Sequence, residues 1–321
     1  MTIVAVLDDY QGRAREYADW ASLEPGVEVE FFRRPISPDA LAVTLAEFDV
    51  LVLMRERTAF PRSVLEALPN LRLLVTTGMR NASVDTGYLR QRGVTVCGTG
   101  SPVPGALGVP STAEVAWALI LAVGKRVTIE DRAIRGGYWQ LGVPVNLAGA
   151  TLGLAGLGNL GAAMVGPARA FGMDVTAWSQ NLTEERAAAV GVRRVSKAEL
   201  LAGADVLSIH LVLSDRTRGL FQAADLALMK STAVVINTSR GPIIEPRALI
   251  DALRNGTIAG AGLDVYDEEP LPAGHELTGL DNVVLLPHLG YVTEPGLRNM
   301  YRQAVEDIAA FLAGAPIRTI S

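Results

Sequence analysis

Short β-branched runs alternate with helical patterns along this 321-residue chain, in two successive series. Such alternation predicts parallel sheets with helices on both faces. We therefore expect an α/β fold class with two doubly wound parallel-sheet domains, Rossmann- or flavodoxin-like, and a cleft between them. The expected strands are Val4–Leu7, Val27–Phe32, Val50–Met54, Leu71–Val75 and Val94–Val96, then Thr151–Ala155, Asp174–Trp178, Val206–His210, Ala233–Asn237, Gly260–Asp264 and Val283–Leu286.

The boundary between the two domains is expected in the segment Gly98–Thr112, which is rich in glycine and proline. A long helical pattern, Ala113–Lys125, follows it, with Ser111 or Thr112 as the expected cap. One more helical pattern, Pro295–Ala313, comes after the last strand and should pack on the first domain. The predicted division is residues 1–104 plus 290–321, and residues 105–289.

Bulk composition is that of a soluble globular protein, with 49% hydrophobic and 20% charged residues. The formal net charge of −5 and the lack of a basic run argue against a nucleic-acid partner. The apolar run Val115–Val123 is too short to span a bilayer, so no membrane partner is expected. A single cysteine, Cys97, cannot form an internal disulfide, and the start of the chain lacks a signal-peptide pattern. We therefore expect a cytoplasmic protein.

A glycine-rich loop, Gly156-x-Gly158-x-x-Gly161, lies between an expected strand and a helical pattern that continues to Phe171. The three glycines permit a tight turn, a close approach to pyrophosphate and close helix–strand packing. The N-terminus of the helix offers backbone N–H groups to phosphates. This context predicts a dinucleotide site, so residues 105–289 should form the dinucleotide-binding domain and the other residues a substrate-binding domain.

The second strand of this series ends with Trp178-Ser179-Gln180, where an acidic residue normally binds the ribose hydroxyls of the cofactor. Ser179 removes the carboxylate that would repel a 2′-phosphate, but no arginine directly follows to attract one. NAD and NADP both remain open as cofactors, with a slight preference for NADP.

Three functional side chains follow the next expected strands. They are Arg240, Glu269 and His288. Arginine grips a carboxylate through two parallel charged hydrogen bonds. Histidine donates or accepts a proton near neutral pH, and a neighbouring carboxylate fixes its tautomer. Beside a dinucleotide, these are the groups that hydride transfer to the carbonyl of a 2-oxo acid requires. No metal site is expected.

These motifs resemble the D-isomer-specific 2-hydroxy acid dehydrogenase family over nearly the whole chain. The resemblance is densest in Gly153–Gly161, Ala204–His210, Ile236–Gly241, Ala261–Pro270 and Pro287–Gly290. It implies hydride transfer between a nicotinamide and C2 of a small D-2-hydroxy acid or 2-oxo acid, as in hydroxypyruvate and glyoxylate reductases. His288 would be the acid and base, Arg240 would hold the substrate carboxylate and carbonyl oxygen, and Glu269 would hydrogen-bond the imidazole.

The resemblance also implies cofactor contacts and a homodimer formed through the helix after residue 112 and the arm that follows it. Asp264 would receive the nicotinamide carboxamide, and the backbone at Asn159 and Leu160 would meet the pyrophosphate. His210 and Thr217 would flank the cofactor. The complete expected cofactor set is Gly156, Gly158, Asn159, Leu160, Gly161, Ser179, Gln180, His210, Thr217, Thr238, Ser239, Asp264 and Gly290.

The substrate loops depart from the family pattern. Relatives typically carry Gly-x-Gly-x-Asp-Asn in the second loop, and here Arg80 stands at the second glycine. Such a cation would either bind a second carboxylate or phosphate of the substrate, or turn outward to form a salt bridge. Tyr291, where small residues are usual, would narrow the pocket. The expected substrate contacts are Arg55, Gly78, Met79, Arg80, Arg240 and Tyr291.

Two alternatives stay open. One is a phosphite-type dehydrogenase on the same scaffold; a formate enzyme is disfavoured, since such enzymes typically place glutamine where Glu269 stands. The other is a non-enzymatic regulator that senses a dinucleotide.

Overall fold

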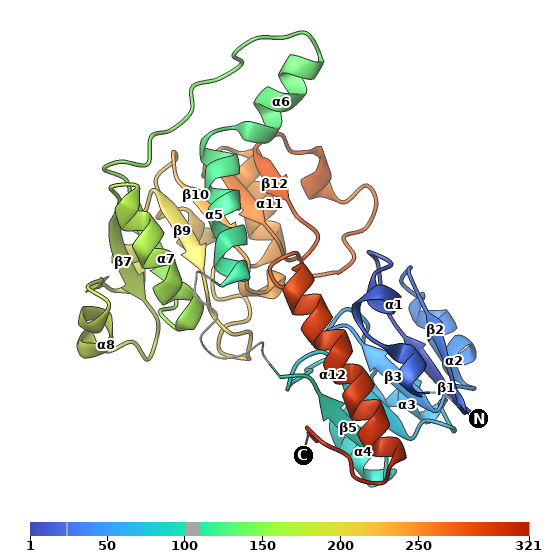
Figure 1. Cartoon of the computed structure of the whole chain (residues 1–321). Helices are drawn as coiled ribbons and strands as arrows, with labels where there is room; N and C mark the ends of the chain where they lie inside the picture. Colours follow the sequence, from blue (N-terminus) through green and yellow to red (C-terminus); the bar gives the residue numbers. More distant parts are fainter. Residues whose placement is uncertain (24, 101–109, 321) are drawn as a thin grey trace. The chain divides into compact units, whose positions relative to one another are not determined.

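The structure is a computed structural model that describes residues 1–23, 25–100 and 110–320. The chain divides into two units, Met1–Ala106 with Thr293–Ser321 (unit 1) and Leu107–Val292 (unit 2). Each unit contains one parallel sheet with helices packed on it, so the predicted fold class is confirmed (Figure 1). Most of the expected boundary segment, Gly98–Thr112, lies outside the described residues.

Unit 1 has a five-stranded sheet in the order β2-β1-β3-β4-β5, with all neighbours parallel. The strand order reverses between β1 and β3, which is where ligands bind in open α/β sheets. Its strands are β1 (Thr2–Val6), β2 (Val27–Phe31), β3 (Val50–Leu53), β4 (Leu73–Thr76) and β5 (Thr95–Gly98). Its helices are α1 (Ala14–Tyr17), η1 (Trp20–Leu23), α2 (Pro38–Leu45), α3 (Arg62–Glu66), α4 (Thr86–Gln91) and α12 (Glu294–Leu312).

The last helix, α12, packs on β4, β5 and α1 of unit 1. It buries Leu297, Tyr301, Ala304 and Ile308, spaced three or four residues apart as one face of a helix requires. The chain after α12 pairs with β5, because Gly98 donates to the carbonyl of Arg318 at 3.0 Å. The C-terminal segment is therefore part of the fold of unit 1.

Unit 2 has a seven-stranded parallel sheet in the order β12-β11-β10-β9-β6-β7-β8. The order reverses between β6 and β9, beside the glycine-rich loop. The strands are β6 (Thr151–Ala155), β7 (Asp174–Trp178), β8 (Arg193–Arg194), β9 (Val206–Ile209), β10 (Val234–Asn237), β11 (Gly260–Leu263) and β12 (Val283–Leu285). The helices are α5 (Ser111–Gly124), α6 (Val127–Arg135), α7 (Asn159–Ala170), α8 (Glu184–Ala189), α9 (Lys197–Gly203), α10 (Ala223–Leu226), η2 (Gly241–Ile243), α11 (Pro246–Arg254) and η3 (Glu276–Gly279).

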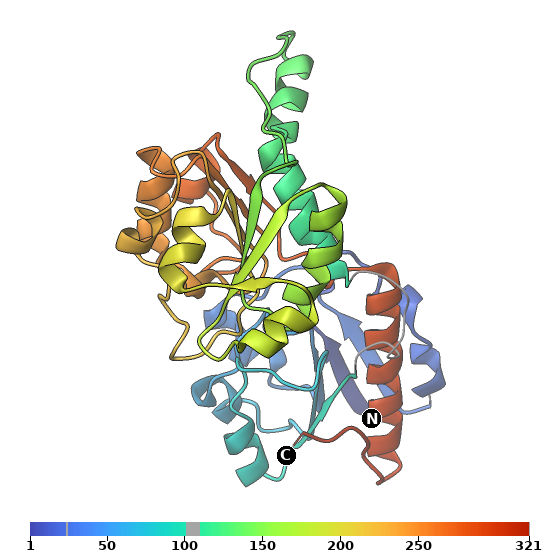
Figure 2. The ribbon, with the colours of Figure 1, turned by 90° about the vertical axis from the view of Figure 1, so that its left-hand side faces the viewer.

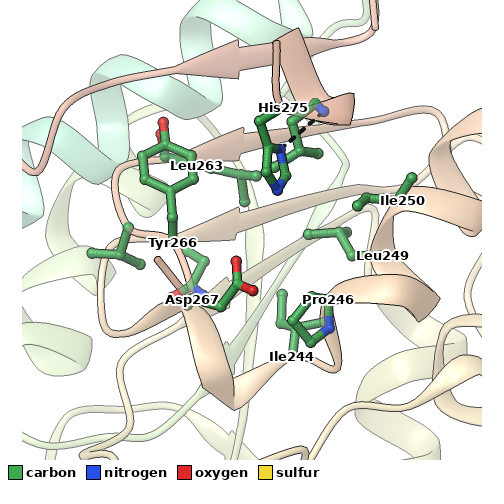
Figure 3. Close-up of a pocket in the computed structure, with 12 residues that line it drawn as sticks. Ile244, Pro246, Leu249, Ile250, Leu263, Tyr266, Asp267 and His275 are labelled. Atoms are coloured by element: carbon green, nitrogen blue, oxygen red, sulfur yellow. Dashed lines mark hydrogen bonds between the residues drawn. The ribbon is translucent and has the colours of Figure 1, made fainter. Parts of the chain in front are cut away.

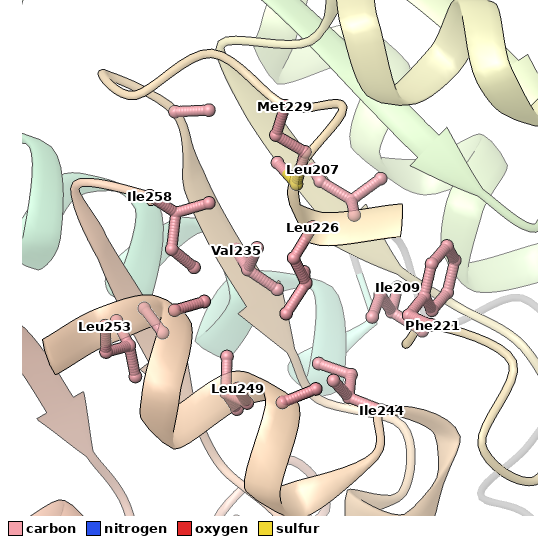
Figure 4. Close-up of a cluster of buried hydrophobic side chains, with 14 of the residues drawn as sticks. Leu207, Ile209, Phe221, Leu226, Met229, Val235, Ile244, Leu249, Leu253 and Ile258 are labelled. Carbon is pink, nitrogen blue, oxygen red and sulfur yellow. The ribbon is translucent and has the colours of Figure 1, made fainter. Parts of the chain in front are cut away.

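Both faces of the unit 2 sheet are buried. Along β10, Val235 packs into the cluster under α11, whereas Val234 and Ile236 pack into the cluster under α5 and α7. Figure 4 shows Leu249 and Leu253 of α11 over the first of these faces. Burial on both faces explains why these strands are continuous apolar runs without alternation.

The expected helix cap at Ser111 or Thr112 is wrong. The helix α5 already includes Ser111, and Pro110, with φ −57° and ψ 139°, is the residue before its first turn. The Thr112 hydroxyl instead donates to the carbonyl of Gly290 at 2.8 Å. Thr112 therefore ties α5 to the loop after β12. Within the described ranges, no helix is both long and apolar enough to cross a membrane.

Candidate active site

The three glycines of the loop after β6 have different surroundings. A Cβ at Gly156, whose φ is +104°, would lie 2.5 Å from the carbonyl oxygen of His210, and one at Gly161 would lie 2.1 Å from the carbonyl oxygen of Gly156. A Cβ at Gly158 would meet nothing within 4 Å. Two glycines thus permit the turn and its packing, and the third leaves open space at the start of α7. That arrangement fits a pyrophosphate at the helix N-terminus, where Asn159 and Leu160 are the first two helical residues.

The turn after β7 is polar and is supported by an arginine from β8. Leu182 donates its N–H to the carbonyl of Ser179 at 3.1 Å, which closes the turn. Arg194 donates from Nε to the carbonyl of Leu182 at 2.7 Å and pairs with Glu184 at 3.1 Å. The side chains of Ser179 and Gln180 form no hydrogen bond or ion pair with any residue that the structure describes. The neutral side chains of Ser179 and Gln180 beside the guanidinium of Arg194 are compatible with the 2′-phosphate of a bound NADP.

His210 follows β9 and lies under the glycine-rich loop. Its Nε2 is 2.9 Å from Ser208 Oγ, and its Nδ1 is buried without a hydrogen-bond partner among the described residues. Burial lowers the pKa of the His210 ring to about 4, so the imidazole is neutral at physiological pH. Thr217 uses its hydroxyl inside its own loop, donating to the carbonyl of Val212 at 2.7 Å.

The loop that carries Arg240 is fixed by the last residue of β10. Buried Asn237 accepts the N–H of Ser239 at 3.0 Å and donates to the carbonyl of Arg240 at 3.0 Å. Ser239 in turn donates from its hydroxyl to the carbonyl of Ile209 at 2.8 Å, while the hydroxyl of Thr238 is buried. The Arg240 side chain is half-buried. Its position therefore depends on an amide side chain that binds only backbone groups.

Gly241 brings this loop into direct backbone contact with the segment after β11. A Cβ there would lie 2.0 Å from the carbonyl carbon of Tyr266. Behind the contact is a small, mostly apolar pocket. Figure 3 shows Ile244, Pro246, Leu249 and Ile250 on one side of it and Tyr266, Asp267 and His275 on the other. The apolar lining suits packing rather than a charged substrate.

Glu269 and His288 are in direct contact. Glu269 accepts the N–H of Tyr266 with one oxygen at 2.8 Å, and its other oxygen lies 2.6 Å from His288 Nδ1. The side chains of His288 and Glu269 are 19% and 27% exposed. His288 Nε2 makes no hydrogen bond with a described residue, so that nitrogen is available to a ligand. The ring of Tyr291 packs edge to face against the His288 imidazole, with 5.4 Å between the two ring centroids.

Asp264, at the end of β11, holds the backbone beyond His288. Its carboxylate accepts the N–H groups of Leu289 at 2.7 Å and Gly290 at 2.8 Å. Burial raises the pKa of Asp264, and these two hydrogen bonds act in the opposite direction. His288 itself has a φ of +54°, which is uncommon for a residue with a side chain. The two hydrogen bonds therefore stabilise a strained loop that presents the imidazole.

The remaining expected substrate residues belong to unit 1. Arg55, after β3, has a φ of +54° and donates from its guanidinium to the carbonyl of Thr77 at 3.2 Å. Gly78 has a φ of +133°, and Met79 and Arg80 beside it are exposed.

Sequence reasoning missed three residues that shape the unit 2 site, namely Arg194, Asn237 and Tyr266. Arg194 lies on a two-residue polar edge strand that has no hydrophobic pattern to reveal it. Tyr266 joins the loops after β11 and β12, because its hydroxyl donates to the carbonyl of Leu286 at 2.9 Å. An asparagine at the end of a strand before a polar loop was the one available signal for Asn237. No group of three or more His, Cys, Asp or Glu residues that could hold a metal occurs in the part of the chain that the structure describes.

A glycine-rich strand–turn–helix at the sheet's switch point, followed by an arginine loop and a carboxylate–imidazole pair, defines a dinucleotide-dependent oxidoreductase. Comparison with known proteins gives the family. Residues 117–290 match the model for the NAD binding domain of the D-isomer specific 2-hydroxyacid dehydrogenases. The chain belongs to this family.

Relatives support the same class over most of the chain. A glyoxylate reductase of Aeropyrum pernix is 38% identical over 260 residues, covering 78% of this chain and 76% of that protein. A hydroxypyruvate reductase of Blautia hydrogenotrophica is 29% identical and covers 99% of both chains. The crystal structure of a phosphoglycerate oxidoreductase from Vibrio cholerae O395 matches with a TM-score of 0.90 at 34% identity, covering 98% of this chain and 100% of that one. The family and these relatives support a 2-hydroxyacid dehydrogenase that uses a nicotinamide dinucleotide.

Proposed function

We propose that this enzyme transfers a hydride between nicotinamide C4 and C2 of a small D-2-hydroxy acid or 2-oxo acid, with His288 as the acid and base. The observation that carries the proposal is the 2.6 Å contact between His288 Nδ1 and Glu269. Because that contact occupies Nδ1, the proton would move through Nε2. A positioned acid of this kind contributes roughly 10²- to 10⁴-fold to a rate.

The other members of the site have supporting roles. Arg240 binds the substrate carboxylate and stabilises charge on the carbonyl oxygen, since its planar guanidinium donates two parallel hydrogen bonds. Glu269 orients the imidazole and is itself fixed by the N–H of Tyr266. The bound dinucleotide supplies or accepts the hydride. Its pyrophosphate would meet the N-terminus of α7, and Asp264 would lie beside the nicotinamide.

The proposed division into domains is close to the two units, but it assigns residues 290–292 of unit 2 to the substrate-binding domain. Residues 105–289 hold the cofactor, and residues 1–104 with 290–321 contribute the substrate loops at Arg55 and Gly78–Arg80. Tyr291 would narrow the space beside His288, which its ring already contacts.

The cofactor proposal is that NADP(H) is accepted and slightly preferred over NAD(H). The turn Ser179–Leu182 has no carboxylate to repel a 2′-phosphate. The guanidinium of Arg194 under that turn supplies the cation that the neighbouring sequence lacks. An arginine held by a backbone carbonyl is positioned in advance, which lowers the entropic cost of binding a phosphate.

A homodimer is proposed through the helix after residue 112, α5, and the segment that follows it, which consists of α6 and the arm, residues 136–146. Figure 2 shows α6 and the arm extending away from the sheet of unit 2. Along the arm Tyr138, Trp139 and Val143 are 65%, 75% and 94% exposed. Contiguous exposed apolar groups of this kind mark protein interfaces, and a second copy of the same arm region is the proposed partner.

The proposed function is tested by following nicotinamide absorbance with NADH and NADPH in parallel. The acids would be glyoxylate, hydroxypyruvate, pyruvate, 2-oxobutyrate, phenylpyruvate, oxaloacetate and 3-phosphohydroxypyruvate. Oxidation with at least one acid, and its loss in Arg240→Lys through a raised KM, is the expected result. Tight dinucleotide binding with no turnover of any acid would refute the proposal, and phosphite would then be assayed.

A further inference from the structure

Tyr266 contacts both loops that carry the carboxylate–imidazole pair, through two separate hydrogen bonds. Its backbone N–H donates to Glu269 Oε1 at 2.8 Å. Its hydroxyl, at the far end of the side chain, donates at 2.9 Å to the carbonyl of Leu286, two residues before His288. The other oxygen of Glu269 lies 2.6 Å from His288 Nδ1. These contacts form a closed circuit, and every residue in it belongs to unit 2.

Two other side chains hold the backbone on the far side of His288. The Asp264 carboxylate accepts the N–H groups of Leu289 at 2.7 Å and Gly290 at 2.8 Å. The Thr112 hydroxyl donates to the carbonyl of Gly290 at 2.8 Å. Both side chains act on residues that follow the imidazole, so neither fixes the backbone that leads from β12 to His288.

The backbone between β12 and His288 has different support. Leu286 donates its N–H to the carbonyl of Leu263 at 2.8 Å, which continues the pairing of β12 with β11. Pro287 has no N–H to donate. The Tyr266 hydroxyl supplies a side-chain hydrogen bond on this side, with the carbonyl of Leu263 as a second, more distant acceptor at 3.3 Å.

Tyr266 itself is firmly placed. It is 8% exposed and packs in the cluster under α11. Its carbonyl lies so close to the backbone of Gly241 that a Cβ there would be 2.0 Å from the carbonyl carbon. Burial raises the pKa of the Tyr266 hydroxyl, and the carboxylates of Asp264 and Glu269 raise it further. The hydroxyl therefore keeps its proton at physiological pH and remains a hydrogen-bond donor.

We infer that Tyr266 is a positioning residue, whose hydroxyl sets the separation of His288 from Glu269 and thereby the rate of proton transfer. The inference rests on the proposed function, in which His288 is the acid and base. Tyr266 acts through the pair: its N–H holds the carboxylate, its hydroxyl holds the start of the histidine loop, and the rigid ring keeps these two anchors at a fixed distance. Without the hydroxyl, the contact between His288 and Glu269 should lengthen.

Tyr266→Phe removes the hydroxyl and keeps both the ring and the backbone N–H. Its kcat should fall about 10- to 100-fold, as for a small misplacement of a catalytic group. The KM for the 2-oxo acid and the dinucleotide affinity should stay near those of the wild type, because Arg240 and the glycine-rich loop are unchanged. Tyr88→Phe is the matched control, since the half-buried hydroxyl of Tyr88 makes no hydrogen bond with a described residue. An unchanged kcat in Tyr266→Phe, or a rise in KM alone, would overturn the inference.

The same substitution in a Glu269→Ala background separates positioning from a general loss of structure. That background has no pair contact left to adjust. Adding Tyr266→Phe should therefore lower kcat by less than about twofold more, as non-additive effects of residues that act through one contact require. A further fall as large as the one in the wild-type background would mean that the hydroxyl acts elsewhere, and would contradict the inference.

Crystal structures of the wild type and Tyr266→Phe distinguish failure of this inference from failure of the proposed function, because they need no turnover. In the variant, the distance between His288 Nδ1 and the Glu269 carboxylate should exceed the hydrogen-bond range of about 3.2 Å. If the wild type reduces no acid and the distance still lengthens, the positioning stands and the proposed reaction does not. If the wild type reduces acids and the distance is unchanged in the variant, the positioning is overturned and the reaction stands.

Discussion

Replacing Gly241 by alanine tests whether the arginine loop and the glutamate loop must touch through bare backbone. The added Cβ would lie 2.0 Å from the carbonyl carbon of Tyr266, 2.2 Å from its oxygen and 2.4 Å from the nitrogen of Asp267. The closest approach is about 1.4 Å short of the 3.4 Å at which ordinary contact begins. All three obstacles are backbone atoms, so no side-chain rotation relieves the overlap, and one loop must move.

The displacement should reach the catalytic pair. Tyr266 donates its N–H to Glu269 at 2.8 Å, and Glu269 contacts His288 at 2.6 Å, so moving Tyr266 moves both partners. A misplacement of about 1 Å costs roughly 100-fold in rate. Overpacking of this kind also destabilises a protein by about 1 to 3 kcal/mol. We expect Gly241→Ala to lose about 100-fold in kcat/KM, with dinucleotide affinity close to that of the wild type.

The assay is steady-state reduction of the best 2-oxo acid, with urea unfolding of the same samples and dinucleotide titration by tryptophan fluorescence. Gly279→Ala is the matched control, because a Cβ at Gly279 would meet nothing within 4 Å. Its activity and stability should stay near those of the wild type. If Gly241→Ala has the same kcat/KM and the same unfolding free energy as the wild type, the reasoning is refuted. The two loops could then move apart without affecting activity or stability.

Three further substitutions test separate parts of the account. His288→Gln should lower turnover by about 10²- to 10⁴-fold and keep dinucleotide binding; an unchanged single-turnover rate would exclude His288 as the acid. Ser179→Asp should weaken binding of 2′,5′-ADP but not of 5′-ADP in calorimetry, because a carboxylate repels the 2′-phosphate, and equal weakening of both would contradict the cofactor proposal. Burial raises the pKa of Asp307 to about 7 despite the opposing Arg318, so the folded state binds this proton more tightly than the unfolded chain. The contribution of this proton to stability is complete below the ordinary pKa of 3.8 and is lost as pH rises through about 7. In Asp307→Asn the unfolding free energy, measured by urea unfolding, should therefore depend less on pH in that range. The same pH dependence in the variant and the wild type would contradict the assignment.

Local sequence patterns predicted the parts of the fold that depend on local physics. The apolar strands of both sheets and the glycine-rich turn are encoded by periodicity and by backbone freedom, which are visible within ten residues. The edge strand Arg193–Arg194 was not predicted, since both residues are polar and exposed and only pairing with β7 makes them a strand. The cap of α5 was misassigned because Thr112 has a tertiary partner, the carbonyl of Gly290, 178 positions away.

The candidate site also combines features that local sequence predicts with features that depend on tertiary contacts. Arg240, Glu269 and His288 were named from their chemistry and order, but the sequence could not say what positions them. The side-chain amide of Asn237 holds the backbone of the Arg240 loop, and this asparagine was visible in the sequence, whereas Glu269 is held by the backbone N–H of Tyr266. A backbone partner such as Tyr266 leaves no pattern in side-chain type, because every residue except proline offers the same N–H and carbonyl.

Backbone strain gives a reason for the buried carboxylate of Asp264. A left-handed conformation at His288 costs about 1 to 2 kcal/mol relative to a relaxed one. Each hydrogen bond from Leu289 and Gly290 to the Asp264 carboxylate is worth about 1.5 to 3 kcal/mol, so two of them more than offset the strain. If the Asp264 carboxylate contacted only the cofactor, no hydrogen bond within the protein would offset the cost of burying its charge. Its two oxygens instead connect the end of β11 to the histidine loop, so the residue expected to receive the nicotinamide also determines where the imidazole stands.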